Sequence, residues 1–252
     1  MIRGLYSATT GMLVQKRKQE NVSENLANLN TNSYKKQQII NKSFNEMYVK
    51  NRENGGLDTI GTLELGTEID EVYTDFTQGL LNQTNKNKDF AIDGNGFFTI
   101  EGDGELLYTR DGNFKVDSSG RLTTKQGYPV LAEGLSKGDD GYIYVKDKDI
   151  SVNENGEFKL DGNERRFMIV DFNDKALLEK RGENIYSSEE NPTAFNLDTK
   201  VKQGYLEKSN IDPLEEMVRM IEITRNFESN YKTLQSIDET LGKAVNEVGR
   251  IR

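Results

Sequence analysis

The chain has 252 residues and carries 42 acidic against 33 basic side chains, a net charge of −9; this balance argues against a protein that binds nucleic acid over its whole surface, because phosphate neutralisation needs a basic face. Cysteine and histidine are both absent, which excludes disulfides, thiol nucleophiles, histidine-based triads and zinc sites with the usual ligands. Charged residues make up 30% of the chain, above the usual share of about 25%, so part of it is expected to be solvated or to fold against a partner.

The first predicted element is a helix over residues 1–32, with its pattern strongest up to residue 30. Eight positions at heptad spacing form a seam along this helix. Two of them are polar, Gln15 and Gln19, and the apolar ones are Leu5, Ala8, Met12, Val22, Leu26 and Leu29. A stripe this narrow is typical of a coiled coil. Gly4 and Gly11 each weaken the helix by about 1 kcal/mol, so it is not expected to stand alone.

The N-terminus makes a poor cleavable signal peptide, because its apolar run is interrupted by threonine and glycine. No apolar stretch approaches the length of about 18 residues that spans a bilayer. We therefore expect no transmembrane segment and, if the protein is exported, a route without a cleaved signal.

Residues 33–85 are predicted to form an extended or β connecting region. Within it, Thr67–Thr74 alternates polar and apolar side chains as a strand does. The Asn- and Gly-rich stretch 41–62 is the best candidate for an extended or mobile segment.

Residues 86–200 are predicted to form a central, mostly β domain of short hairpins. Its β-like runs are separated by Asp-Gly and Asn-Gly pairs, which supply the positive φ angles of tight turns. A short motif recurs 44 residues apart, as Gly112-Asn-Phe-Lys-Val-Asp117 and Gly156-Glu-Phe-Lys-Leu-Asp161. Two copies indicate a recurring hairpin but are too few for a repeat architecture.

Residues 201–252 are predicted to form a connecting strand and a long C-terminal helix. Asp212 caps the helix, Pro213 needs no N–H there, and Glu215 suits the positive first turn. A stripe with 3-4 spacing follows, in which Thr224 and Asp238 are the polar members, and its apolar members are Met217, Met220, Phe227, Tyr231, Leu234, Leu241, Val245 and Val248. A helix packed on its own domain remains an alternative, but a coiled-coil seam is favoured because the stripe is narrow and continues for more than four heptads. The fold class is thus α+β: long terminal helices in a coiled-coil-like layer, and a mostly β central domain of short hairpins between them.

Three groups of polar residues were weighed as chemical sites. A calcium loop starting at Ser151 has Gly162 where a bidentate glutamate is needed. The acid pairs Asp139/Asp140 and Glu189/Glu190 lie in very polar stretches, where a solvated surface is the simpler interpretation than a glycosidase pair. We therefore predict no catalytic, metal or cofactor-binding residue, and no cofactor.

Several motifs, in order along nearly the whole chain, resemble those of bacterial flagellar rod and hook proteins. The N-terminal signature is similar at Leu5–Gly11, Asn25-Leu-Ala-Asn28, Thr31 and Tyr34-Lys35. The central motifs are similar at Gly94–Phe98 and Tyr108–Phe114, and the C-terminal signature at Gln203–Asn210, Glu215–Ile221 and Arg225–Glu228. In its length and central motifs the chain is most similar to the distal-rod type, and the proximal-rod type remains an alternative.

The resemblance implies a structural, non-enzymatic subunit of the basal-body rod. Such proteins are exported unfolded by the flagellar type III apparatus and polymerise through their terminal helices into a hollow shaft that transmits torque. The implied partners are copies of the chain and other rod and hook proteins, and the two apolar stripes given above are the predicted assembly interface. One departure is Ser33, where the family commonly has glycine; we expect Asn32 to take the positive φ instead.

An alternative from another class remains open at this point. In this alternative, the chain is a secreted β-domain binding protein or a glycan-active enzyme, and its terminal helices serve only for dimerisation. Such an enzyme has no need of heptad stripes at both chain ends, so the paired stripes favour the assembly protein.

Overall fold

A computed structural model describes residues 2–44, 47–51, 58–63, 66–102, 104–133, 141–145, 150–160, 163–182, 184–190, 192 and 199–248. The chain forms two compact units. The first comprises the residues up to Ala27, then 37–73, then those from Asp212 onward, and the second comprises 28–36 and 74–211. The chain therefore passes from one unit to the other four times.

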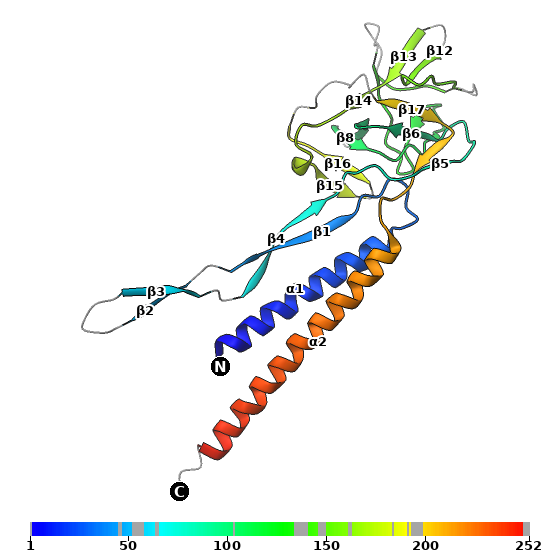
Figure 1. The fold of residues 1–252 in the computed structure, drawn as a ribbon. Coiled ribbons are helices and arrows are strands. Elements are labelled where there is room, and N and C mark those ends of the chain that lie inside the picture. Colours follow the sequence, from blue (N-terminus) through cyan, green and yellow to red (C-terminus); the bar gives the residue numbers. More distant parts are fainter. Residues whose placement is uncertain are drawn as a thin grey trace. The chain divides into compact units, whose positions relative to one another are not determined.

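The first unit is built on two long helices, α1 (Ile2–Ala27) and α2 (Pro213–Lys243), which lie side by side and antiparallel (Figure 1). A π-helical turn, Ala244–Val248, continues α2. Strand β1 (Gln37–Ser43) pairs with β4 (Thr67–Thr74), and β2 (Met47–Asn51) pairs antiparallel with β3 (Asp58–Leu63). These two ribbons lie end to end, because β2 and β3 fall between β1 and β4 along the chain (Figure 1).

The second unit is an assembly of small antiparallel sheets. Its largest sheet has the strand order β14-β7-β8-β16-β15, and a three-stranded sheet has the order β11-β13-β12. Its described residues also form three two-stranded pairs: β9 with β10, β6 with β17, and β5 with β18. The elements, in chain order, are β5 (Leu81–Gln83), β6 (Phe90–Asp93), β7 (Phe97–Gly102), β8 (Glu105–Thr109), β9 (Lys115–Val116), β10 (Leu122–Thr123), β11 (Ala132–Glu133), β12 (Glu157–Leu160), β13 (Asn163–Phe167), β14 (Ile169–Val170), the 3-10 helix η1 (Lys175–Leu177), β15 (Glu179–Gly182), β16 (Ile185–Ser187), β17 (Lys200–Gln203) and β18 (Tyr205–Glu207).

Aromatic rings fill the core of the second unit. Phe167 is fully buried, and its ring centroid lies 5.0–6.3 Å from those of Phe90, Phe98, Phe114 and Phe158. Phe114 and Phe158 are the phenylalanines of the motif that recurs 44 residues apart. The recurrence therefore supplies two of the rings that pack around one central phenylalanine.

Local signals in the sequence identify the long elements well. The structure confirms the α+β class, the strand at Thr67–Thr74 and the start of the C-terminal helix. The carboxylate of Asp212 accepts hydrogen bonds from the backbone N–H groups of Leu214 and Glu215, at 2.8 and 3.5 Å. Neither α1 nor α2, nor any other helix in the described ranges, carries an apolar stretch fit to span a membrane.

Two backbone expectations differ from what is observed. Ser33 itself has the positive φ, at 54°, and Asn32 does not; the Ser33 hydroxyl donates to the Arg110 carbonyl at 2.9 Å, which holds this residue in place. Gly112 serves close approach, because a Cβ there would lie 1.8 Å from the Phe90 carbonyl oxygen. The Asp111-Gly112 pair is therefore not a positive-φ turn of the kind expected.

Candidate assembly interface

The register of the helix pair is set by three close approaches. A Cβ on Gly4 would lie 3.2 Å from Ile237, and one on Gly11 would lie 3.0 Å from the amide of Asn230. At the other end, the amide nitrogen of Asn25 donates to the carboxylate of Glu216 at 3.2 Å. The two glycines thus let α2 approach α1 closely, in addition to the weakening of the helix that glycine brings.

Asn25 also connects this helix pair to β1. Its side chain, which is almost fully buried, donates to the Gln37 carbonyl at 2.9 Å and accepts from the Gln37 N–H at 3.2 Å. One amide therefore joins α1, β1 and the first turn of α2 within the first unit.

The apolar members of the predicted N-terminal stripe are at least half-buried, whereas Gln19 in the same seam is exposed. Ala8 and Val22 are buried, and Leu5, Met12, Leu26 and Leu29 are half-buried. Leu29 follows the end of α1 and belongs to the second unit.

The predicted stripe on α2 is divided between two faces. Met220, Phe227, Leu234 and Leu241 are half-buried, whereas Met217, Tyr231 and Val245 are 50%, 53% and 71% exposed. The alternate positions that are buried or half-buried lie one residue earlier, at Glu216, Ile223, Asn230, Ile237 and Ala244. The side chain of Val248 lies outside the described residues.

The inward face of α2 was missed at these alternate positions because two of them are polar. Glu216 and Asn230 break the apolar pattern, so a search for hydrophobic periodicity selects Met217 and Tyr231 beside them. The exposed half of the stripe is consequently Met217, Thr224, Tyr231, Asp238 and Val245, in which an apolar side chain recurs every fourteen residues. Such a row can contact another polypeptide.

A buried ionic network lies inside the second unit. Lys35 and Glu207 have fully buried side chains whose Nζ and Oε1 atoms lie 2.6 Å apart, and an Arg110 nitrogen lies 3.5 Å from the other Glu207 oxygen. Lys35 also donates to the Thr77 carbonyl at 2.7 Å, and the Gly79 N–H donates to Glu207 at 2.8 Å.

Each charged residue of the network lies in a different one of the sequence motifs that resemble those of rod and hook proteins. Lys35 belongs to the N-terminal signature, Arg110 to a central motif and Glu207 to the C-terminal signature. Arg110 further donates to the carbonyls of Gly94 and Gly96, at 2.7 and 2.9 Å, which ties a second central motif to the same centre. The network therefore has a structural function, since it joins segments up to 172 residues apart.

Burial lowers the pKa of Lys35 from 10.5 to about 8, because desolvation of the ammonium group outweighs the attraction of Glu207. Between these two values the unfolded chain keeps a proton that the folded chain has lost, so the free energy of unfolding that this lysine contributes rises with pH. We expect the stability of the wild type to rise relative to Lys35→Met from pH 7 to 9.5. Urea unfolding of both chains measures this difference, and parallel pH profiles would contradict it.

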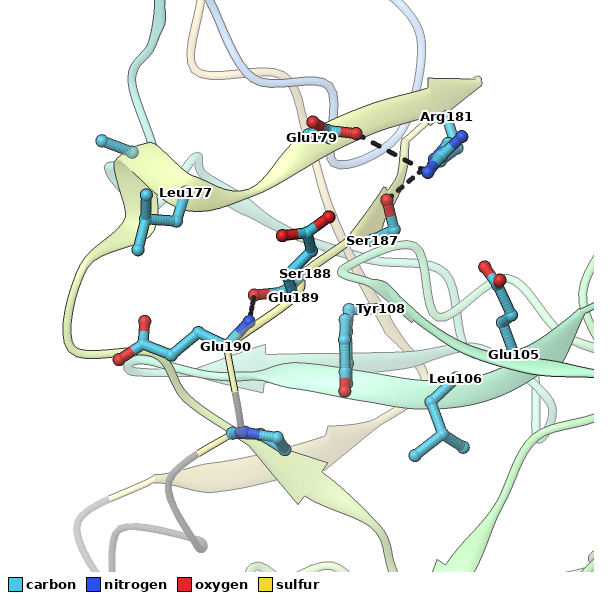
Figure 2. A pocket seen from close by; sticks show the side chains of 12 residues that line it. Glu105, Leu106, Tyr108, Leu177, Glu179, Arg181, Ser187, Ser188, Glu189 and Glu190 are labelled. Atoms are coloured by element: carbon cyan, nitrogen blue, oxygen red, sulfur yellow. Dashed lines mark hydrogen bonds and ion pairs between the residues drawn. The ribbon is translucent and has the colours of Figure 1, made fainter.

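A cleft of about 730 Å³ lies on the largest sheet of the second unit (Figure 2). Glu105, Glu179, Glu189 and Glu190 line it beside Leu106, Tyr108 and Leu177, and Arg181 contacts Glu179 and Ser187. Glu189 is exposed and Glu190 is half-buried. The cleft is open, and four of its lining residues are acidic.

The other candidate chemical sites lie in a turn or outside the described residues. Asp139 and Asp140 lie outside the described residues. The side-chain oxygen of Asn153, in the candidate calcium loop, accepts from the N–H groups of Asn155 and Glu157 and so closes a turn. In the part of the chain that the structure describes, no three acidic side chains are grouped in a way that could hold a metal ion.

Comparison with known proteins gives full-length relatives. Residues 202–247 match the family described as "Flagellar basal body rod FlgEFG protein C-terminal", and residues 91–160 match "Flagellar hook protein FlgE/F/G D1 domain". The flagellar basal-body rod protein FlgG of Buchnera aphidicola subsp. Acyrthosiphon pisum is 34% identical, with 96% of this chain and 98% of the relative covered. FlgG of Bacillus subtilis is 31% identical (98% and 99% covered), and FlgF of Caulobacter vibrioides is 30% identical (100% of each).

Proposed function

Because the chain belongs to the flagellar basal-body rod protein family, as a structural subunit of the rod, we propose that it polymerises through both faces of its helix pair. Its partners are copies of itself and other rod and hook proteins. The family is non-enzymatic, which sets aside the glycan-active enzyme considered above. We further propose export by the flagellar type III apparatus, and a hollow, torque-transmitting shaft as the product.

The divided stripe on α2 is the observation that carries this proposal. The members near α1, among them Met220 and Phe227, are half-buried within one chain. Met217, Tyr231 and Val245 are at least half exposed. Apolar residues scattered singly over a surface need no explanation, but these three are regularly spaced. Met217 and Tyr231 lie fourteen residues apart on α2 and therefore on one flank of it, as an interface between helices requires. Val245 follows in the π-helical turn that continues α2.

Tyr231 and its neighbour Lys232 provide a matched test of that interface. Both are exposed on α2, so Tyr231→Ala and Lys232→Ala should each leave the free energy of unfolding of the single chain within about 0.5 kcal/mol. Loss of a tyrosine anchored at an interface typically weakens binding by about 2 kcal/mol or more. Tyr231→Ala should therefore raise the critical concentration for polymerisation at least about tenfold, as measured by sedimentation, whereas Lys232→Ala should not.

The same pair can be tested in cells that lack the endogenous rod subunit. Lys232→Ala is expected to restore motility and Tyr231→Ala is not. If both variants polymerise and restore motility like the wild type, this flank of α2 is not the interface.

A further inference from the structure

The cleft on the largest sheet of the second unit (Figure 2) has exposed apolar side chains as well as acidic ones. Leu106, on β8, and Leu177, in η1, are 45% and 55% exposed there. The cleft volume of about 730 Å³ falls within the range of about 300–1,000 Å³ that is typical of ligand sites. An occupant of the cleft therefore covers apolar surface in addition to meeting charge.

Tyr108 contributes a polar group to the cleft from a side chain that is otherwise buried. It lies on β8 two residues after Leu106, lines the cleft, and is only 3% exposed. Its ring packs edge-to-face on Phe172, with the ring centroids 4.8 Å apart, and in Figure 2 the side chain stands among the lining residues, with Glu190 to one side and Leu106 to the other. Its hydroxyl has no hydrogen-bond partner among the described residues. Because a polar group held out of water needs a partner, this hydroxyl is available to a polar group that enters the cleft.

Glu190 is a second lining residue whose polar atoms are incompletely satisfied. It follows β16 and is half-buried, and one of its carboxylate oxygens is screened from solvent without a hydrogen-bond donor in the described part of the chain. The same part of the chain provides no cation for this carboxylate. A charge that is partly removed from water is stabilised by a nearby opposite charge. A cation entering the cleft would supply one.

The charges that line the cleft do not cancel. They are one base, Arg181, and four acids, Glu105, Glu179, Glu189 and Glu190. Arg181 is already engaged, because its guanidinium lies 3.6 Å from the carboxylate of Glu179. Within the described ranges, the other three acids have no ion pair. The cleft is therefore complementary to a ligand with positive charge.

A basic side chain flanked by apolar residues fits all of these features. The stem of an arginine or lysine packs along apolar surface, as at the two leucines, while its head stays with the carboxylates. Guanidinium and ammonium groups are hydrogen-bond donors only, and both the carboxylate of Glu190 and the hydroxyl of Tyr108 can accept. A metal ion fits less well, since no three acidic side chains of the described residues are grouped to hold one.

The charge of the whole chain favours a partner of another sequence. The chain carries a net charge of −9, so two copies repel each other at long range, whereas a basic polypeptide is attracted. We propose that this cleft binds a segment of another protein in which arginine or lysine stands beside apolar residues. The cleft lies in the second unit and includes none of the α2 residues used in the proposed function, so this contact goes beyond that function and can fail without it.

A labelled peptide provides a direct test with the full-length chain. The probe is fluorescein-labelled Gly-Leu-Arg-Arg-Leu-Gly, and its fluorescence anisotropy is followed as dilute, unpolymerised protein is added. Saturable binding is expected. A peptide with glutamate in place of both arginines should not bind, and one with serine in place of both leucines should bind more weakly. Slower amide hydrogen exchange in Glu105–Thr109 and Ile185–Ser187 on addition of the probe would locate it in the cleft.

Two conservative variants and two matched controls assign the binding to the cleft. Glu190→Gln should weaken the probe at least about tenfold, as for other partly desolvated charge pairs. Tyr108→Phe removes only the hydroxyl and should weaken the probe about two- to tenfold. Glu154→Gln and Tyr205→Phe make the same chemical changes outside the cleft and should change the affinity less than about twofold, because distant charges are screened. Thermal melting checks that each variant is folded, and Glu190→Gln decides the question if Tyr108→Phe is not.

The remaining outcomes would overturn the proposal. Equal weakening by Glu190→Gln and Glu154→Gln would mean that the probe responds only to the net charge of the chain. If spermidine, a polyamine without apolar side chains, displaces the probe as effectively as the unlabelled peptide does, the cleft takes small cations and not a protein segment. Absence of saturable binding to the wild type would leave the cleft without its proposed ligand, while polymerisation through the helix pair would be unaffected.

Discussion

Glu207→Gln is expected to lower the free energy of unfolding by about 3–5 kcal/mol. The substitution removes the negative charge that lies 2.6 Å from Lys35 and 3.5 Å from Arg110, and both of these side chains are buried. Two positive groups would then lie in a low-dielectric interior without the carboxylate that contacts both of them, which favours loss of a proton from Lys35 or the entry of water. Urea unfolding followed by circular dichroism, with hydrogen exchange to locate the change in the second unit, measures the effect.

Glu154→Gln is the matched control for this prediction. Glu154 also pairs with a lysine, at 2.8 Å from Lys200, but both side chains are more than half exposed. Its loss should change the free energy of unfolding far less than Glu207→Gln does, because exposed ion pairs are screened by solvent. Adding Lys35→Met to Glu207→Gln should recover part of the stability, because one of the two unmatched charges disappears. Equal effects of Glu207→Gln and Glu154→Gln would contradict the importance of the network.

Phe167→Ala is expected to cost about 3–5 kcal/mol, the usual range for truncating a buried aromatic side chain. The Phe167 side chain is fully buried, and four other phenylalanine rings surround it. The cavity left behind would remove packing from all four rings at once. Since a domain of this kind is stable by only about 5–15 kcal/mol, thermal and urea unfolding should shift markedly.

Phe167→Leu serves as the conservative comparison and should cost clearly less, since most of the buried volume stays filled. The helix pair is expected to keep its far-UV circular dichroism signal in Phe167→Ala below the new midpoint. A loss below 1 kcal/mol in Phe167→Ala would mean that this ring is not the centre of the core.

Local physics made much of this fold predictable. The Asp212 cap, the start of the C-terminal helix at Pro213 and the strand Thr67–Thr74 follow from neighbouring residues alone, and they are observed. The α2 stripe was predictable at Met220, Phe227, Leu234 and Leu241, which the periodicity selects. At the alternate positions the prediction lies one residue after the side chain that is actually buried. The side chains that α2 buries depend on how it packs against α1 and not on hydrophobicity alone.

The buried network was beyond reach from the sequence. Lys35 and Glu207 are 172 residues apart, and charged residues are usually solvated, so nothing local indicates that their side chains are fully buried. The only available signal was that both lie in motifs of the resemblance. Ser33 shows the same limitation on a smaller scale, because its positive φ is supported by a hydrogen bond to the Arg110 carbonyl, 77 residues away.

The interrupted course of the chain through its two units has a consequence during synthesis on the ribosome. Helix α1 is translated well before its partner α2, since the hydrogen bond between Asn25 and Glu216 joins residues 191 positions apart. At a translation rate of about 5–20 residues per second, the ribosome needs roughly 10–40 seconds after making α1 to reach α2. A lone helix of 26 residues with two glycines is marginally stable in water, so the helix pair of the first unit cannot form until α2 has been made.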